Sequence, residues 1–234
     1  ISKKFGVDAS QPGTTLGVPE PAVLVRLIEK WGEQRKAARV QLVIDVSGSM
    51  GDEVATGETK LDLAKRASIE ALSQFKPEDI VGLRIFSTNV SPREPTRDFI
   101  DLVPFGKIAD NRELIASRIR SLTPIEGTPL YATAKATVEE MKKAYDPSRI
   151  NAVVLLTDGR NEDDFTDLDA TLSSLRAGSE GQSSTPVRLF TIAYGANADK
   201  SVLKRLAEAT NAGAYDATDP LTVTRVFTAV ISNF

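Results

Sequence analysis

Short apolar runs rich in β-branched residues alternate with amphipathic segments along most of the chain, and this alternation restricts the fold more than any other feature. The runs at 40–45 and 150–156 are strongly apolar and typical of strands that are buried on both faces. Further strands are predicted at 80–86, 99–103 and 187–194. Strands of this kind usually belong to a sheet that is covered by helices on both sides.

Apolar residues at helical spacing predict the covering helices. They are expected at 24–31, 61–75, 111–122, 128–145, 167–176, 203–210 and 223–230. Asn111 is the predicted cap of one helix, and Asp219-Pro220 is the predicted start of the last. Because helices and strands alternate, we expect right-handed crossovers and a doubly wound, Rossmann-like α/β fold. The run at 99–103 alternates apolar residues with acids, so it is predicted to be an antiparallel edge strand.

The composition excludes several classes of site. The chain has 234 residues without a histidine or a cysteine, so a Ser-His-Asp triad, a disulfide and the usual zinc ligand sets are impossible. A metal site in this chain must therefore use oxygen ligands. The net charge is −3 and no basic stretch is present, so we expect no nucleic-acid partner. The longest apolar run, at 152–156, is too short to cross a bilayer, so we expect no membrane span.

The domain organisation follows from changes in pattern along the chain. Residues 1–19 are rich in turn-forming residues and are predicted to be a linker or an N-terminal arm. Residues 20–36 carry the pattern of a leading amphipathic helix. Residues 37–234 are expected to form one large α/β domain.

Oxygen-bearing side chains follow two of the predicted strands. Asp45, Ser47 and Ser49 follow the first strand, Asp158 follows the strand at 150–156, and Thr128 lies at a helix start. Ligands of doubly wound sheets bind beyond the carboxyl ends of the strands, so these five side chains are candidates for one site. Hydroxyl and carboxylate oxygens suit Mg²⁺, with Mn²⁺ and Ca²⁺ as alternatives. If the direct ligands are mainly neutral hydroxyls, the cation keeps positive charge and an open position for an incoming carboxylate.

The order Asp45-x-Ser47-x-Ser49, then Thr128, then Asp158 resembles the metal-ion-dependent adhesion site of von Willebrand factor type A domains. The resemblance covers roughly residues 36–234. It implies that the three hydroxyls hold the cation, that both acids support it directly or through water, and that an acidic residue of a protein partner completes the shell. It also implies a binding module rather than an enzyme, built on a mostly parallel six-stranded sheet with one antiparallel edge strand and helices on both faces.

A narrower resemblance concerns the first part of the chain. The stretch at 12–40, followed by Ser-Gly-Ser-Met at 47–50, is similar to bacterial proteins in which a solute-binding-type domain precedes a von Willebrand factor type A domain. This implies that the chain is the carboxy-terminal module of a longer protein anchored at the cell surface. The lack of cysteine is compatible with such an extracellular location.

Three functions remain open on the sequence. The first is a module that captures an Asp or Glu of a protein partner through the cation. The second is a magnesium-dependent hydrolase or phosphoryl-transfer enzyme. The absence of a Gly-rich phosphate-binding loop and of histidine argues against it, although Lys60 or Lys65 could in principle serve as its base. The third is an intramolecular module that docks on another domain of its own polypeptide. Thr128 is also a candidate helix cap, and the acids at 162–164 are typical of a solvated loop.

Overall fold

The computed structural model describes residues 20–21, 23, 36–91, 94, 97–163, 165–177, 181, 183–219 and 222–232. The chain divides into two compact units, residues 1–35 and 36–234. The predicted arm at 1–19 and nearly all of the predicted leading helix at 20–36 lie outside the described residues. The fold below is that of the second unit.

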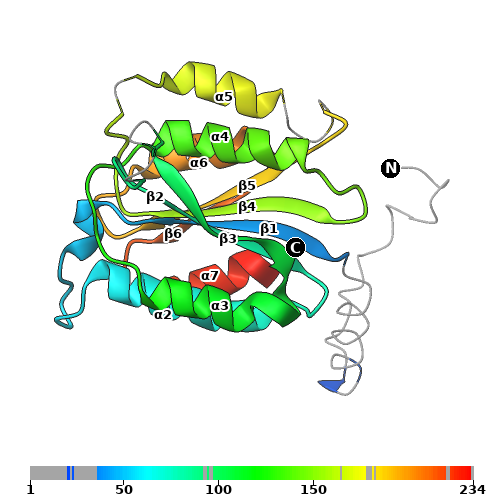
Figure 1. The fold of residues 1–234 in the computed structure, drawn as a ribbon, viewed down its shortest axis with the longest axis horizontal. Helices are drawn as coiled ribbons and strands as arrows, with labels where there is room; N and C mark the ends of the chain where they lie inside the picture. The colour runs from blue at the N-terminus through cyan, green and yellow to red at the C-terminus, as the bar shows by residue number, and fades with distance from the viewer. Residues whose placement is uncertain are drawn as a thin grey trace, which may run out of the picture. The chain divides into compact units, whose positions relative to one another are not determined.

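A six-stranded sheet forms the centre of this unit (Figure 1). Its strands are β1 (Ala38–Asp45), β2 (Ile80–Phe86), β3 (Phe99–Lys107), β4 (Ile150–Thr157), β5 (Arg188–Tyr194) and β6 (Ala214–Ala217). The spatial order is β3-β2-β1-β4-β5-β6, and only β3 runs antiparallel to its neighbour. The predicted doubly wound fold with an antiparallel edge strand is therefore confirmed.

Helices cover both faces of the sheet. They are α2 (Lys60–Ala71), α3 (Ile108–Arg120), α4 (Leu130–Lys143), α5 (Leu168–Arg176), α6 (Lys200–Glu208) and α7 (Val223–Ser232), with short 3₁₀ turns η2 (Gly48–Gly51) and η3 (Leu72–Gln74). Figure 1 shows α2, α3 and α7 on one face and α4, α5 and α6 on the other. Within the described part of the chain, no helix has the length and hydropathy needed to cross a bilayer.

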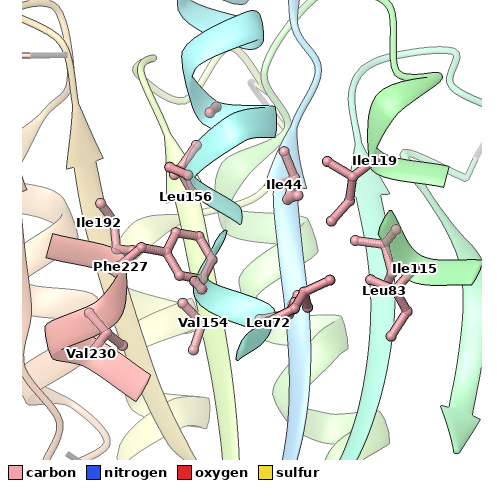
Figure 2. Packing of buried hydrophobic residues seen from close by; sticks show 14 of the residues in the cluster. Ile44, Leu72, Leu83, Ile115, Ile119, Val154, Leu156, Ile192, Phe227 and Val230 are labelled. Carbon is pink, nitrogen blue, oxygen red and sulfur yellow. The ribbon is translucent and has the colours of Figure 1, made fainter. Parts of the chain in front are cut away.

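Strand periodicity divides the core into two clusters. Leu42 and Ile44 of β1 point to the α2, α3 and α7 side, whereas Val43 between them packs on the α4, α5 and α6 side. Figure 2 shows the first cluster, where Phe227 of α7 lies close to Val154 and Ile192 of the sheet. The second half of β1 is therefore apolar on both faces, which explains why Leu42, Val43 and Ile44 follow one another without a polar residue between them.

Several element boundaries differ from the prediction. β3 continues to Lys107 and leads directly into α3, so Asn111 lies inside that helix and is not its cap. The amides of Ile108 and Ala109 instead donate to the carbonyls of Asp79 and Pro77, so a capping side chain is not required. The helix predicted at 61–75 ends at Ala71 and continues as η3. The short strand β6 was not identified individually, because four residues are too few to show a period.

The sheet topology creates a position for a ligand at the carboxyl ends of the two central strands, β1 and β4. Strand order reverses between β1 and β4, because the chain after β1 builds outward in one direction and the chain after β4 builds outward in the other. The two strands are paired in parallel with Ile44 opposite Leu156, so Asp45 and Asp158 lie at adjoining carboxyl ends. This is the switch point at which doubly wound sheets bind ligands.

We predict that Phe227→Ala lowers the free energy of unfolding by about 3–5 kcal/mol, because it leaves a cavity between α7 and the sheet. Arg225→Ala on the same helix is the control, since Arg225 is exposed and its loss should change stability by less than about 0.5 kcal/mol. Urea unfolding measures both variants. Equal, small losses in the two would show that α7 is not anchored through Phe227.

Candidate metal centre

The first loop of the site is a tight turn directly after β1. Asp45 is the last residue of the strand, and one of its carboxylate oxygens accepts a hydrogen bond of 2.7 Å from the amide of Ser47. The 3₁₀ turn η2 follows, and its Met50 is buried in the core. The amide of Gly48 donates to the carbonyl of Glu126 at 2.7 Å, which fixes this turn against the segment before α4. Hydrogen bonds of the backbone thus hold this turn, so the hydroxyl groups of Ser47 and Ser49 are available for other contacts.

The hydroxyls of this turn reach the second acid. The Oγ atoms of Ser47 and Ser49 are 3.3 Å apart, and Ser49 donates to Oδ1 of Asp158 at 2.8 Å. Asp158 follows the last residue of β4, and both Asp45 and Asp158 have no exposed surface. Two buried carboxylates, the buried hydroxyl of Ser47 and the half-buried hydroxyl of Ser49 therefore lie together at two strand ends.

Thr128 brings the third loop to this cluster. It is 2% exposed, and a Cβ built on Gly159 would lie 2.9 Å from its Oγ1, so the hydroxyl sits against the residue next to Asp158. The hydrogen bonds recorded for Thr128 use its backbone: its amide donates to the carboxylate of Glu162, and its carbonyl accepts from the amides of Glu162 and Leu130. The alternative role as a helix cap is wrong, because Pro129 holds the cap position of α4 and no side chain caps that helix. All five residues predicted for the site lie together.

Burial controls the electrostatics of Asp45. Its complete burial raises the pKa to about 7, against the opposing effect of hydrogen bonds from Thr157 and Ser47, and the nearby charge of Asp158 adds to the rise. An acid in this state gains free energy from any neighbouring positive charge, because that charge replaces the lost solvation of its ionised form.

Thr157 and Glu162 also shape the site, although neither was among the predicted residues. The hydroxyl of Thr157, at the end of β4, donates to Oδ2 of Asp45 and accepts from the amide of Gly159. Glu162 holds Thr128 from both sides: its carboxylate accepts from the amide of Thr128 at 3.0 Å, and its own amide donates to the Thr128 carbonyl at 2.9 Å. The sequence signal for Glu162 was an acidic loop, which is more often simply solvated.

Lys60, the first residue of α2, places an ammonium group in the same cluster. Its Nζ lies 2.6 Å from Oδ2 of Asp158, 3.0 Å from Asp52 and 3.2 Å from the carbonyl of Ser49. Burial by itself lowers the pKa of Lys60, but the hydrogen bonds and charges of Asp158 and Asp52 outweigh it and raise the pKa above its ordinary value. Lys60 is therefore a charged partner of Asp158.

The donor set has the chemistry that a hard divalent cation requires. It consists of hydroxyl and carboxylate oxygens, which Mg²⁺, Mn²⁺ and Ca²⁺ prefer. The described residues contain no cluster of three or more acids suited to a metal, so any cation at this place would depend on the hydroxyls of Ser47, Ser49 and Thr128 as much as on the two acids. The cluster is also preformed by hydrogen bonds between its members and their loops.

The fold and this cluster define a Rossmann-like α/β domain with a buried oxygen-donor centre at the point where strand order reverses. A family model of the von Willebrand factor type A domain matches residues 40–229. The match spans most of the chain, so the protein belongs to the von Willebrand factor type A domain family. A search of curated proteins finds no match.

Solved structures share the fold at low sequence identity. A von Willebrand factor type A protein from Catenulispora acidiphila is 19% identical with a TM-score of 0.67, over 84% of this chain and 42% of that one. Proximal thread matrix protein 1 from the mussel byssus, with a zinc-occupied MIDAS motif, is 17% identical with a TM-score of 0.64, over 84% and 48%. The pilus adhesin SpaC from Lactobacillus rhamnosus GG is 17% identical with a TM-score of 0.63, over 86% and 31%. This chain thus spans less than half the length of these three proteins.

We predict that Glu162→Ala loosens the loop that carries Thr128, because the Thr128 amide loses its acceptor. The expected loss is about 1 kcal/mol of unfolding free energy, with faster hydrogen exchange at the Thr128 amide. Glu162→Gln keeps a carbonyl oxygen and should restore most of the protection. Glu113→Ala, at an exposed position of α3, is the control and should leave exchange at Thr128 unchanged. Unaltered exchange in Glu162→Ala would contradict the proposed clamp.

Proposed function

We propose that this domain is a protein-binding module that uses a divalent cation, Mg²⁺ in the first instance, to bind an acidic residue of a partner. The observation that carries the proposal is the convergence of Asp45, Ser47, Ser49, Thr128 and Asp158 in one buried cluster at the strand-order switch point. A bound divalent cation supplies an electrophilic position for a carboxylate oxygen of the partner.

The neutral and the charged residues of the cluster would have different roles in holding the cation. Ser47, Ser49 and Thr128 would hold the cation with neutral hydroxyls, while Asp45 and Asp158 supply negative charge directly or through water. The hydroxyl of Ser49 already donates to Asp158, so this acid is oriented toward the hydroxyl side of the cluster. Neutral ligands leave the cation with net positive charge, which favours an acidic partner over a neutral one.

The surroundings of the cluster favour a protein as the partner. Phe165 is fully exposed and lies three residues after Glu162, which touches Thr128; Ile125 is partly exposed and lies three residues before Thr128. Exposed apolar side chains on the loops that carry such a centre can add apolar contact area around one specific polar contact, as in surfaces that bind proteins. A partner that presents an acid next to an apolar side chain fits this surface.

The contacts of Lys60 and Lys65 argue against the enzymatic alternative, which would need one of these two lysines as its base. The ammonium group of Lys60 is bound to two carboxylates and a carbonyl, and Lys65 pairs with Asp62 on the outer face of α2. Neither lysine is thus free to accept a proton beside the cluster. Structural neighbours include a pilus adhesin and a byssus matrix protein, which supports adhesion or assembly at the cell surface or outside the cell as the setting. Docking on another domain of the same polypeptide is a second proposal, since the chain spans only part of these relatives.

We predict that Mg²⁺ or Mn²⁺ raises the melting temperature of the wild-type chain. At about 100 times the dissociation constant, mass action contributes about 2.7 kcal/mol, or about 5–10 °C for a domain of this size. Asp45→Asn and Ser47→Ala should abolish the increase, because the first removes a negative charge of the cluster and the second removes a hydroxyl oxygen. Asp110→Asn and Ser73→Ala, both exposed and outside the cluster, should retain it. A shift of equal size in all four variants would refute the metal assignment.

We also predict that phosphatase and nuclease substrates show no turnover with Mg²⁺ present. The reason is the lack of a free base at the cluster, as described for Lys60 and Lys65. Steady-state assays on the wild-type chain and on Asp45→Asn provide the comparison. Turnover that requires Mg²⁺ and disappears with Asp45 would favour the enzymatic alternative instead.

A further inference from the structure

Lys60 occupies a position that the chain has built with several independent contacts. The capping box of Thr59 and Asp62 fixes the start of α2, and the amide of Lys60 donates to the carbonyl of Asp52 at 3.0 Å. The hydroxyl of Tyr194 donates to the Lys60 carbonyl at 3.0 Å. The side chain lies over Gly195, where a Cβ would be 3.7 Å from its Cε. Lys60 is therefore held in place along its whole length.

This position is electrostatically unfavourable for a lysine unless nearby acids compensate its positive charge. The N-terminal end of a helix carries partial positive charge, so an ammonium group in the first turn of α2 is repelled by the helix itself. Lys60 is also only 8% exposed, and burial of a charge is costly without a partner. What compensates it is the fully buried Asp158, with Asp52 on the solvent side.

The two oxygens of Asp158 have different partners. Oδ1 accepts from the hydroxyl of Ser49 at 2.8 Å and faces the hydroxyls of the cluster, whereas Oδ2 accepts from Lys60 at 2.6 Å. Lys60 thus binds the oxygen of Asp158 that the cluster does not use. It lies beside the proposed ligands without competing for Ser47 or Thr128.

We infer that Lys60 is a permanent positive charge next to the metal centre that weakens cation binding and keeps the bound cation attractive to a partner's carboxylate. The inference rests on the proposed function. Lys60 brings a buried positive charge into direct contact with Asp158, one of the two buried acids of the cluster. This charge repels a divalent cation at the neighbouring hydroxyls and offsets part of the negative charge of the acids, so a bound cation stays more attractive to a carboxylate than it would be without Lys60. Lys60 is a tuning residue and not a ligand.

The test is isothermal titration of Mg²⁺ into the wild-type chain and three variants. Lys60→Met removes the charge and keeps most of the side-chain length, so Mg²⁺ should bind at least tenfold more tightly. Lys60→Arg keeps the charge and should stay within threefold of the wild type. Lys65→Met is the matched control, because Lys65 lies on the same helix and forms its ion pair with Asp62, outside the cluster, and this variant should bind Mg²⁺ like the wild type.

The direction of the change separates tuning from a merely structural role. If Lys60 only supported the loops, its loss would loosen the cluster and weaken Mg²⁺ binding, so equal or weaker binding by Lys60→Met would overturn the inference. Without Mg²⁺, Lys60→Met should melt earlier than the wild type because Asp158 loses its counter-charge, and Mg²⁺ should raise its melting temperature more than that of the wild type. A variant that folds only with Mg²⁺ supports the inference, and one that stays unfolded with saturating Mg²⁺ contradicts it.

If the proposed function itself is wrong, the titration and melting experiments give a different result. A wild-type chain that shows no Mg²⁺ or Mn²⁺ binding by titration or by melting would remove the metal centre, and with it the role of Lys60. A wild-type chain that binds Mg²⁺, with Lys60→Met no tighter, would remove only the role of Lys60.

Discussion

Two carboxylates that are completely buried at adjoining strand ends are the constraint on which the rest of this structure depends. Parallel pairing of β1 with β4 puts Asp45 and Asp158 beside each other, at a place without access to water. An ionised carboxylate in such a place needs hydrogen bonds or an opposite charge. Thr157 and Ser47 satisfy Asp45, while Ser49 and Lys60 satisfy Asp158. The loops at this edge are therefore organised around two acids as well as around the apolar contact of Met50 with the core.

Backbone hydrogen bonds between loops keep the side chains of the cluster available. The turn after β1 is joined to the segment before α4 by two bonds of 2.7 Å, from Gly48 to Glu126 and from Ile125 to Val46. Glu162 then fixes the Thr128 backbone without using its hydroxyl. A site assembled in this way does not have to be ordered when it binds, so less of the binding free energy is lost to conformational entropy.

The prediction succeeded where a period or a local motif carried the information. Strands such as β1 and β4 were located within a residue or two because long apolar runs have few alternative structures. Four of the five clustered side chains were found because they follow these two strands, and Thr128 was found because it lies at a helix start. Helix ends were less predictable: Asn111 has the chemistry of a cap, yet carbonyls of the loop before β2 already satisfy the start of α3. The strand β6 depends on pairing with β5 rather than on its own four residues.

The sequence alone determined that this chain forms a doubly wound sheet, that any metal must meet oxygen ligands, and which five oxygen-bearing side chains lie together at the switch point. The tertiary structure decided how the charges in that cluster combine. Lys60 and Asp158 are 98 residues apart, and nothing in the local pattern of either indicates the other. Periodicity reports which face of an element a residue occupies, but contact between distant side chains depends on how the elements pack. Only the folded chain therefore reveals that one of the two buried acids already has a cation of its own.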